Sequence, residues 1–178
     1  MPRDDLFRCR VCGLEIHGAA PLMLLHGDLE HAVEQVSAWR AAGMTVGVVR
    51  GRTMRTVAGL FHEVSAALQF PSYFGENWAA FDECLADMEW TPSSAGLVVA
   101  VLDAVEVLSD EPEAEMATLV SAVARAAQTY AEPIDSGEWW DRPPVPFHVV
   151  LQAGEGEETT IRTRWGASGV TFSVLGRR

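Results

Sequence analysis

The carboxylates gathered between residues 76 and 87 are the side chains of this sequence best suited to polar chemistry. Glu76, Glu83 and Asp87 are spaced so that a helix from about residue 76 to residue 88 would place them on one face, with Asp82 beside them. The opposite face of that helix would be apolar and part of the core, with Trp78, Phe81, Leu85 and Met88. Like charges one turn apart on a helix repel by about a few tenths of a kcal/mol. The stripe is therefore either a solvated face or a surface that receives a cationic partner.

Residue types that form covalent or acid–base catalytic sites are poorly represented. All 13 basic residues are arginine, so a Schiff-base lysine, a P-loop lysine and a lysine general base are excluded. Cys84 has no histidine and aspartate at a spacing typical of an activated thiol, and we expect it to pack in the core. His62 and His148 lie within predicted elements and are expected to be structural. We predict that the protein is not an enzyme and needs no cofactor.

A Cys-x-x-Cys pair near the N-terminus is the one pattern typical of a metal site. Cys9 and Cys12, with His17 and His26, would supply four zinc ligands. The second pair of a zinc ribbon is missing, however, and in a strand Cys9 would be a small buried apolar residue. We therefore predict no metal and keep these four residues only as candidates.

The charge is concentrated in the middle of the chain. The whole sequence has 178 residues and a net charge of −12, but residues 61–160 contain nineteen acidic residues and two arginines. This distribution argues against nucleic acid or an anionic membrane as the main partner. The negative charge either steers a basic partner or simply keeps the protein soluble, and charge alone favours the second alternative. A polar N-terminus predicts no signal peptide, no apolar run is long enough to cross a bilayer, and an odd number of three cysteines is no disulfide framework. We expect a soluble, cytoplasmic protein.

The pattern of apolar residues predicts an α/β fold with a small parallel sheet of three strands packed with helices. Strands are expected at 44–49, 96–104 and 147–152. Helices are expected from Asp28 to about residue 42, from Thr53 to residue 70, and from residue 109 or 110 to about residue 130. An N-terminal strand and helix would precede this core, with a possible strand at 6–16 and a short apolar run at 22–25. A C-terminal β-hairpin (159–165 and 170–175) would follow it.

The segment that enters the acidic helix is the most distinctive part of the sequence. It reads Phe70-Pro71-Ser72-Tyr73-Phe74-Gly75-Glu76-Asn77-Trp78. A proline, two aromatic residues, a glycine and an asparagine at this spacing resemble the loop of the barstar family, the intracellular inhibitors of barnase-type secreted ribonucleases. The resemblance extends over residues 44–152 and implies a barstar-like domain there, between an extension at 1–43 and another at 153–178.

The resemblance implies which residues contact a partner. In the family, the loop and the following helix block the basic active site of the ribonuclease, and acidic side chains occupy the place of the RNA phosphate. Tyr73, Phe74 and Asn77 match the loop, and Glu83 stands where the family has its main blocking aspartate. Glu76, Ala79, Asp82, Ala86 and Asp87 complete the predicted partner-binding set.

Several positions depart from the family pattern. Ala79 replaces a usual aspartate, Asp82 stands in place of a tryptophan, and Ala86 and Met88 replace other contact residues. Glu132 is a candidate for the second acidic patch of the family. These departures leave the identity of the target open.

Two functions follow from these observations. The first is an inhibitor that binds a basic ribonuclease or a toxin nuclease domain and blocks its active site with the acidic helix, as an immunity protein does. The alternative is a non-catalytic barstar-like module that binds or regulates another basic protein. The loop at 132–146 contains Trp139 and Trp140, which either pack on the fold or anchor a second interface.

Overall fold

A five-stranded parallel sheet forms the centre of the computed structural model, which describes residues 20–87, 95–139, 141–166, 169–170 and 172–175. The strand order is β2-β3-β4-β1-β5, and every neighbouring pair is parallel. The strands are β1 (Leu22–His26), β2 (Thr45–Arg50), β3 (Leu97–Leu102), β4 (Phe147–Ala153) and β5 (Phe172–Val174). The prediction of a mixed α/β protein with a parallel sheet is confirmed, but the predicted count of three strands is wrong.

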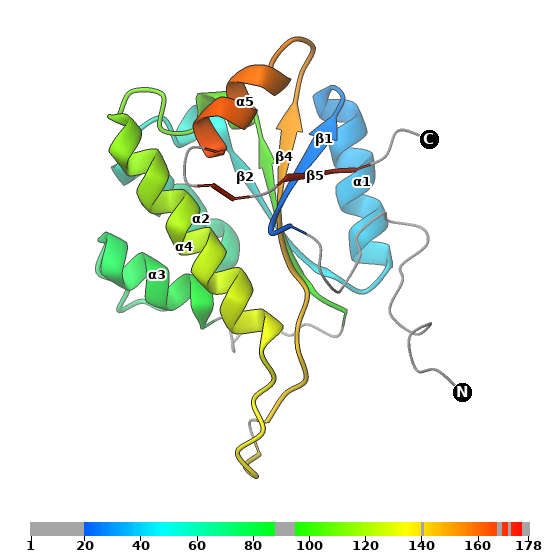
Figure 1. Ribbon diagram of the computed structural model, residues 1–178, viewed down its shortest axis with the longest axis vertical. Helices are drawn as coiled ribbons and strands as arrows, with labels where there is room; N and C mark the ends of the chain where they lie inside the picture. The colour runs from blue at the N-terminus through cyan, green and yellow to red at the C-terminus, as the bar shows by residue number, and fades with distance from the viewer. Residues whose placement is uncertain (1–19, 88–94, 140, 167–168, 171, 176–178) are drawn as a thin grey trace.

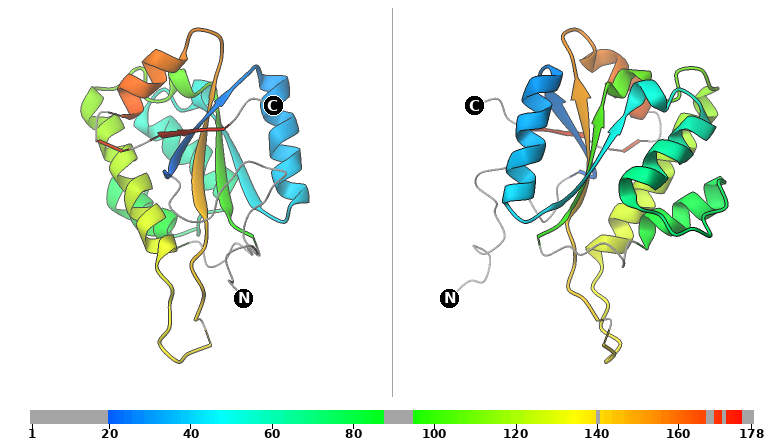
Figure 2. Two further views of the ribbon diagram at one scale, coloured as in Figure 1. Left: turned by 45° about the vertical axis from the view of Figure 1, so that its right-hand side comes forward. Right: turned by 180° about the vertical axis from the view of Figure 1, so that it is seen from behind.

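Five α-helices cover the two faces of this sheet among the described residues. They are α1 (Leu29–Ala41), α2 (Val57–Leu68), α3 (Trp78–Ala86), α4 (Glu113–Ala131) and α5 (Glu158–Trp165). Helix α1 lies alone on one face, and the other four lie on the opposite face (Figures 1 and 2). None of the described helices is both long and apolar enough to span a membrane.

Two apolar clusters on the two faces hold these layers together. Successive residues of β1 alternate between them: Leu22 and Leu24 belong to the cluster beneath α2, α4 and α5, whereas Met23 and Leu25 pack toward α1. Strands β3 and β4 are buried along their whole length. Burial on both faces explains why these strands read as continuous apolar runs in the sequence.

The C-terminal extension differs from the prediction. Residues 159–165 were expected to form the first strand of a hairpin, but they belong to α5, and β5 pairs in parallel with β1 instead. The alternating pattern was misleading because Ile161 and Trp165, four residues apart, both enter the core from one helical face. Glu158 and Arg162 form an ion pair of 2.7 Å one turn apart, which favours the helix.

The N-terminal extension joins the same sheet. The apolar run at 22–25 is β1, which lies between β4 and β5, and Asp28 caps α1 by accepting a hydrogen bond from the backbone N–H of His31 at 2.9 Å. The possible strand at 6–16 lies outside the described residues. The division of the chain at residues 43 and 152 stays a prediction.

Candidate functional site

Asn77 fixes the way the chain enters α3. Its side-chain oxygen accepts a hydrogen bond from the backbone N–H of Ala80 at 3.0 Å, which caps the helix. Its side-chain nitrogen donates to the backbone oxygen of Gly75, also at 3.0 Å. One side chain therefore connects the loop to the helix, as the asparagine of the predicted motif suggests.

The loop before Asn77 holds one aromatic side chain inward and one outward. The backbone N–H of Phe74 donates to the oxygen of Pro71 at 2.9 Å and closes a tight turn. Phe74 packs edge-to-face against Phe61 and Phe70, with ring centroids 5.7 and 5.2 Å apart. Tyr73 is 79% exposed. The loop thus anchors itself through Phe74 and presents Tyr73 to solvent.

An aromatic cluster forms the platform under α3. Phe81 is buried and lies 5.6 Å from the ring of Phe61, 5.6 Å from Trp78 and 5.9 Å from Phe70. Trp78 is only partly buried, and its indole N–H donates to the carboxylate of Glu115 on α4 at 2.7 Å. Leu85 is buried as predicted, and Met88 lies outside the described residues. The inner face of α3 is therefore rigidly packed.

The helix is shorter than predicted, and this changes the acidic stripe. Helix α3 begins at Trp78, so Glu76 lies in the entering loop with a left-handed φ of 47°, and Asp87 is the residue that caps the C-terminal end. A non-glycine residue in that region is strained by about 1–2 kcal/mol. Only Glu83 of the three carboxylates is on the helix itself. Glu76, Glu83 and Asp87 are all exposed, and with Tyr73 they make up what we call the α3 surface.

Glu83 and Asp87 lie at the end of the helix that disfavours negative charge. The C-terminal end of a helix has a partial negative charge, so a carboxylate there costs about 0.3–1 kcal/mol. Helices α1 and α5 follow the usual preference, with acidic residues in the first turn and arginine in the last. Helix α3 has no acidic residue in its first turn and no basic residue in its last. Its charges therefore do not serve helix stability.

The pKa of Cys84 is affected by the negative charges at this end of α3. Burial raises the pKa of the Cys84 thiol, and the charges of Glu83 and Asp87 raise it further. A buried thiol with a raised pKa stays protonated at neutral pH and is a poor nucleophile. The expectation that Cys84 packs in the core agrees with its burial.

Asp82 differs from its neighbours because Arg125 neutralises it. The Arg125 Nε lies 2.8 and 3.0 Å from the two carboxylate oxygens of Asp82. This pair was not predicted from the sequence, and it joins α3 to α4 across 43 positions. Its only signal is that Arg125 is one of two basic residues in the acidic segment 61–160.

The other residues predicted to contact a partner differ in their solvent exposure. Ala79 is exposed and Ala86 is partly buried on α3, while Glu132 is exposed immediately after α4. The hydroxyl of Tyr130, near the end of α4, donates to the backbone oxygen of Leu85 at 3.2 Å. The ends of α3 and α4 therefore meet, and Glu132 begins the segment that leaves this junction.

The carboxyl ends of the central strands are the place where open α/β sheets usually bind ligands. Here the buried side chain of Gln152, in β4, occupies that position. It donates to the backbone oxygen of Gly27 after β1 at 2.8 Å and accepts from the backbone N–H of Asp103 after β3 at 2.9 Å. Nearby, the His26 Nε2 lies 3.3 Å from a Glu158 carboxylate oxygen. We call these five residues the carboxyl edge, and they satisfy one another.

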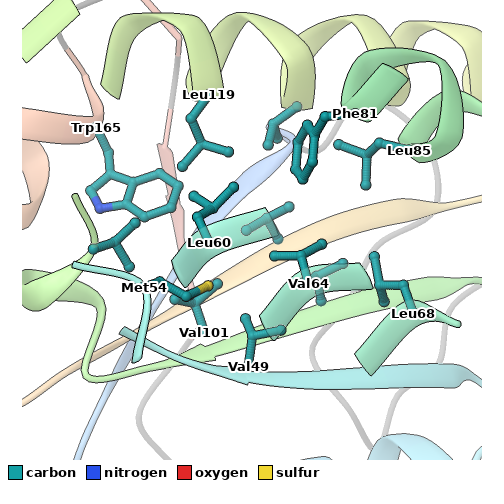
Figure 3. A pocket seen from close by; sticks show the side chains of 14 residues that line it. Val49, Met54, Leu60, Val64, Leu68, Phe81, Leu85, Val101, Leu119 and Trp165 are labelled. Carbon is teal, nitrogen blue, oxygen red and sulfur yellow. The ribbon is translucent and has the colours of Figure 1, made fainter. Parts of the chain in front are cut away.

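A small void lies between the sheet and the helices that cover it, beneath α3 (Figure 3). Its volume is about 30 Å³, and Phe81, Leu85 and Trp165 are among its lining residues, all of them apolar. A void of that size has room for one or two water molecules, but a water needs two to four polar partners. The void is a packing feature of the core and has none of the groups that bind a substrate.

The zinc candidates are only partly described. Cys9, Cys12 and His17 lie outside the described residues, and His26 faces Glu158 at the carboxyl edge. Within the part of the chain that the structure describes, no group of three or more histidine, cysteine, aspartate or glutamate side chains is placed to hold a metal ion.

Solved structures of low sequence identity share the fold. A chain of the Drosophila origin recognition complex bound to DNA has a TM-score of 0.55 and 12% identity, over 88% of this chain and 26% of that one. The Aeropyrum pernix ORC2 protein in its ADP form has a TM-score of 0.52 and 13% identity, over 89% of this chain and 43% of that one. The chain thus spans less than half of either protein, and at these identities the likeness concerns the fold alone.

The family comparison gives a more specific result. No curated protein matches the chain. The model of the family described as barstar (barnase inhibitor) matches residues 44–152, which include the whole of the entry loop, α3 and α4. The match confirms the resemblance inferred from the Pro71 to Trp78 motif, and this chain belongs to the barstar family.

Proposed function

We propose that this protein inhibits a basic barnase-like ribonuclease or toxin nuclease by placing the α3 surface in its active site. The observation that supports this most strongly is the exposed carboxylate of Glu83 on a rigid helix whose own dipole disfavours it. Family membership supports a protein partner of the barnase type. The protein acts without catalysis and needs no cofactor.

The electrostatics of the α3 surface suit such a target. No described cation lies within ion-pair distance of Glu76, Glu83 or Asp87, whereas Asp82 is paired with Arg125. A ribonuclease active site binds phosphate through cationic side chains, and a carboxylate forms short charge-assisted hydrogen bonds with such groups. Complementary fields also raise the rate of association. The carboxylate of Glu83 would take the position of an RNA phosphate and exclude the substrate.

Pre-organisation supports the same proposal. Asn77 joins loop and helix, and Phe74 and Phe81 fix both to the core. A contact surface that is already ordered loses less conformational entropy when it binds. The strained backbone of Glu76 is a further feature typical of functional loops.

The experiment is a titration of the protein into an RNA-cleavage assay with a barnase-type secreted ribonuclease, at low and high salt. We expect one-to-one inhibition that weakens as salt rises, because exposed charges are screened. Glu83→Gln keeps the shape of the side chain and removes its charge. We expect it to weaken inhibition by about tenfold or more, since hot-spot residues are worth about 2 kcal/mol.

Glu34→Gln is the matched control, because it removes an exposed carboxylate from α1 on the other face of the sheet. It should inhibit as the wild type does. Equal inhibition by wild type and Glu83→Gln would contradict the role of Glu83. Absence of inhibition at micromolar protein would contradict the proposed function.

A second function has one specific observation in its favour. Ala79 is exposed where the family usually has an aspartate, and Arg125 neutralises Asp82 beside the surface. The α3 surface therefore has fewer free carboxylates than the family pattern implies. A basic protein other than a ribonuclease would then be the partner, and affinity purification from the producing organism with wild type and Glu83→Gln would separate the two functions.

A further inference from the structure

The segment 132–146 forms an arm that projects beyond α4 and β4, away from the rest of the molecule (Figures 1 and 2). It connects the end of α4 to the start of β4. Trp139, for which the sequence leaves open packing on the fold or anchoring a second interface, lies near its tip and is 88% exposed. Trp140 lies outside the described residues.

The tip of the arm is ordered by one carboxylate. Asp141 accepts hydrogen bonds from three consecutive backbone N–H groups: those of Ser136 at 2.9 Å, Gly137 at 2.8 Å and Glu138 at 3.2 Å. A carboxylate that receives several backbone N–H groups makes strong charge-assisted bonds. These polar bonds therefore hold the turn that presents Trp139 in one shape, although residues 135–139 are all exposed.

The base of the arm is fastened to α4 by Arg142. Its guanidinium donates to the backbone oxygens of Thr129 at 3.2 Å and Glu132 at 3.1 Å, and lies 5.4 Å from the ring centre of Tyr130. The backbones of Ile134 and Arg142 also exchange two hydrogen bonds of 2.9 Å. The arm is thus a braced extension of the fold, and its order is not explained by burial.

An exposed tryptophan on a braced loop has a physical use. Exposure of this much apolar surface lowers solubility, whereas tryptophan is enriched among the residues that dominate binding energy at protein interfaces. A fixed loop also reduces the entropy lost on binding. The 88% exposure of Trp139 on a fixed loop therefore suits an anchor residue of a protein interface.

The charge of the arm indicates the kind of protein that would receive it. Residues 132–146 contain four acidic residues and one arginine. Asp141 and Arg142 are used within the arm, so the carboxylates of Glu132, Asp135 and Glu138 remain on its exposed surface. Three exposed carboxylates beside an arginine that is already engaged suit a partner surface that is basic.

We propose that the arm is a second contact element, in which Trp139 inserts into an apolar pocket with a basic rim on the same protein that the α3 surface binds. This inference rests on the proposed function. The hydrogen bond between Tyr130 and Leu85 joins the base of the arm to the end of α3, so one partner can contact both. Such a partner would have a basic active-site cleft and an apolar pocket beside it.

The test measures association and dissociation rates of the full chain with a barnase-type ribonuclease, for wild type, Trp139→Ala, Asp141→Ala and Glu83→Gln. We expect Trp139→Ala to weaken the complex at least about tenfold, mainly through faster dissociation. Asp141→Ala should have a smaller effect of the same sign because it loosens the turn. Val33→Ala removes an apolar side chain that is 55% exposed on α1, and should change neither rate.

The outcomes separate this inference from the proposed function. If Glu83→Gln weakens the complex and Trp139→Ala does not, the arm is not a contact element and the proposed function stands. If the wild type does not bind the ribonuclease, both are contradicted. If the wild type self-associates and Trp139→Ala abolishes this, the arm binds a second copy and the inference is wrong. Thermal unfolding of each variant verifies that the fold is intact.

Discussion

The α3 surface and the carboxyl edge of the sheet use polar side chains in opposite ways. At the carboxyl edge, Gln152 satisfies the backbone groups of Gly27 and Asp103, and His26 faces Glu158. At the α3 surface, Glu83 projects from the unfavourable end of a helix with no described cation within ion-pair distance. The first arrangement stabilises the fold, and the second leaves charge available to a partner. A fold that usually binds ligands at its strand ends is thus predicted to bind its partner elsewhere.

The largest expected effect comes from removing the platform of the α3 surface. Phe81→Ala deletes a buried ring that contacts three other aromatic side chains. We expect the free energy of unfolding to fall by about 3–5 kcal/mol, and inhibition to be lost with it. Urea denaturation measures this loss, and Tyr73→Ala is the control, because an exposed side chain should change stability by no more than about 0.5 kcal/mol. Equal stability of the two variants would show that the cluster is not the platform.

At the carboxyl edge, we expect a substitution to lower the stability of the fold without weakening inhibition of the partner. Gln152→Ala leaves the N–H of Asp103 and the oxygen of Gly27 without their partner, at a cost of about 1–3 kcal/mol. Inhibition measured well below the unfolding transition should equal that of the wild type. Weaker inhibition by a folded Gln152→Ala protein would mean that the carboxyl edge takes part in binding, and would remove the distinction between the two regions.

Two carboxylates of α3, those of Asp82 and Glu83, are expected to differ in their contribution to binding. Because Arg125 already neutralises this carboxylate, Asp82→Asn should weaken binding much less than Glu83→Gln. The exposed pair should contribute no more than about 1 kcal/mol to folding. A double-mutant cycle with Asp82→Asn and Arg125→Gln measures that coupling. A larger effect of Asp82→Asn than of Glu83→Gln on affinity would reverse the assignment.

The smallest expected effect is a pH dependence of stability. Burial, and then the charges of Glu83 and Asp87, raise the pKa of Cys84 in the folded state. The folded protein therefore favours the protonated thiol, and its stability should fall as pH rises above the ordinary thiol value of 9.0. Urea denaturation at neutral and alkaline pH should show a smaller fall for Cys84→Ala. The same slope in both proteins would contradict a raised pKa of Cys84 in the folded state.

Local sequence patterns predicted the elements that depend on local chemistry. The three apolar runs became β2, β3 and β4, Asp28 caps α1, and Asn77 joins the loop to α3. The family motif was recognisable because that loop is built from short-range contacts. The predicted functions of its side chains stay predictions.

The features that depend on distant contacts were missed. The pairing of β1 with β4 and β5 joins segments more than a hundred residues apart, so nothing local predicts a five-stranded sheet. The alternation at 159–165 fits a strand and a helix equally well, and only the positions of Ile161 and Trp165 in the core decide between them. Likewise, the charge of Asp82 is cancelled by Arg125 from another helix.

Hydrogen exchange of the protein, with and without a bound barnase-type ribonuclease, would show directly whether the partner binds at the α3 surface. We expect binding to slow exchange over residues 70–87 and to leave the carboxyl edge and the residues that flank it, 26–31, 103–110 and 152–158, unchanged. Slower exchange at the carboxyl edge with no change over residues 70–87 would show that the partner binds at the strand ends and not at the α3 surface.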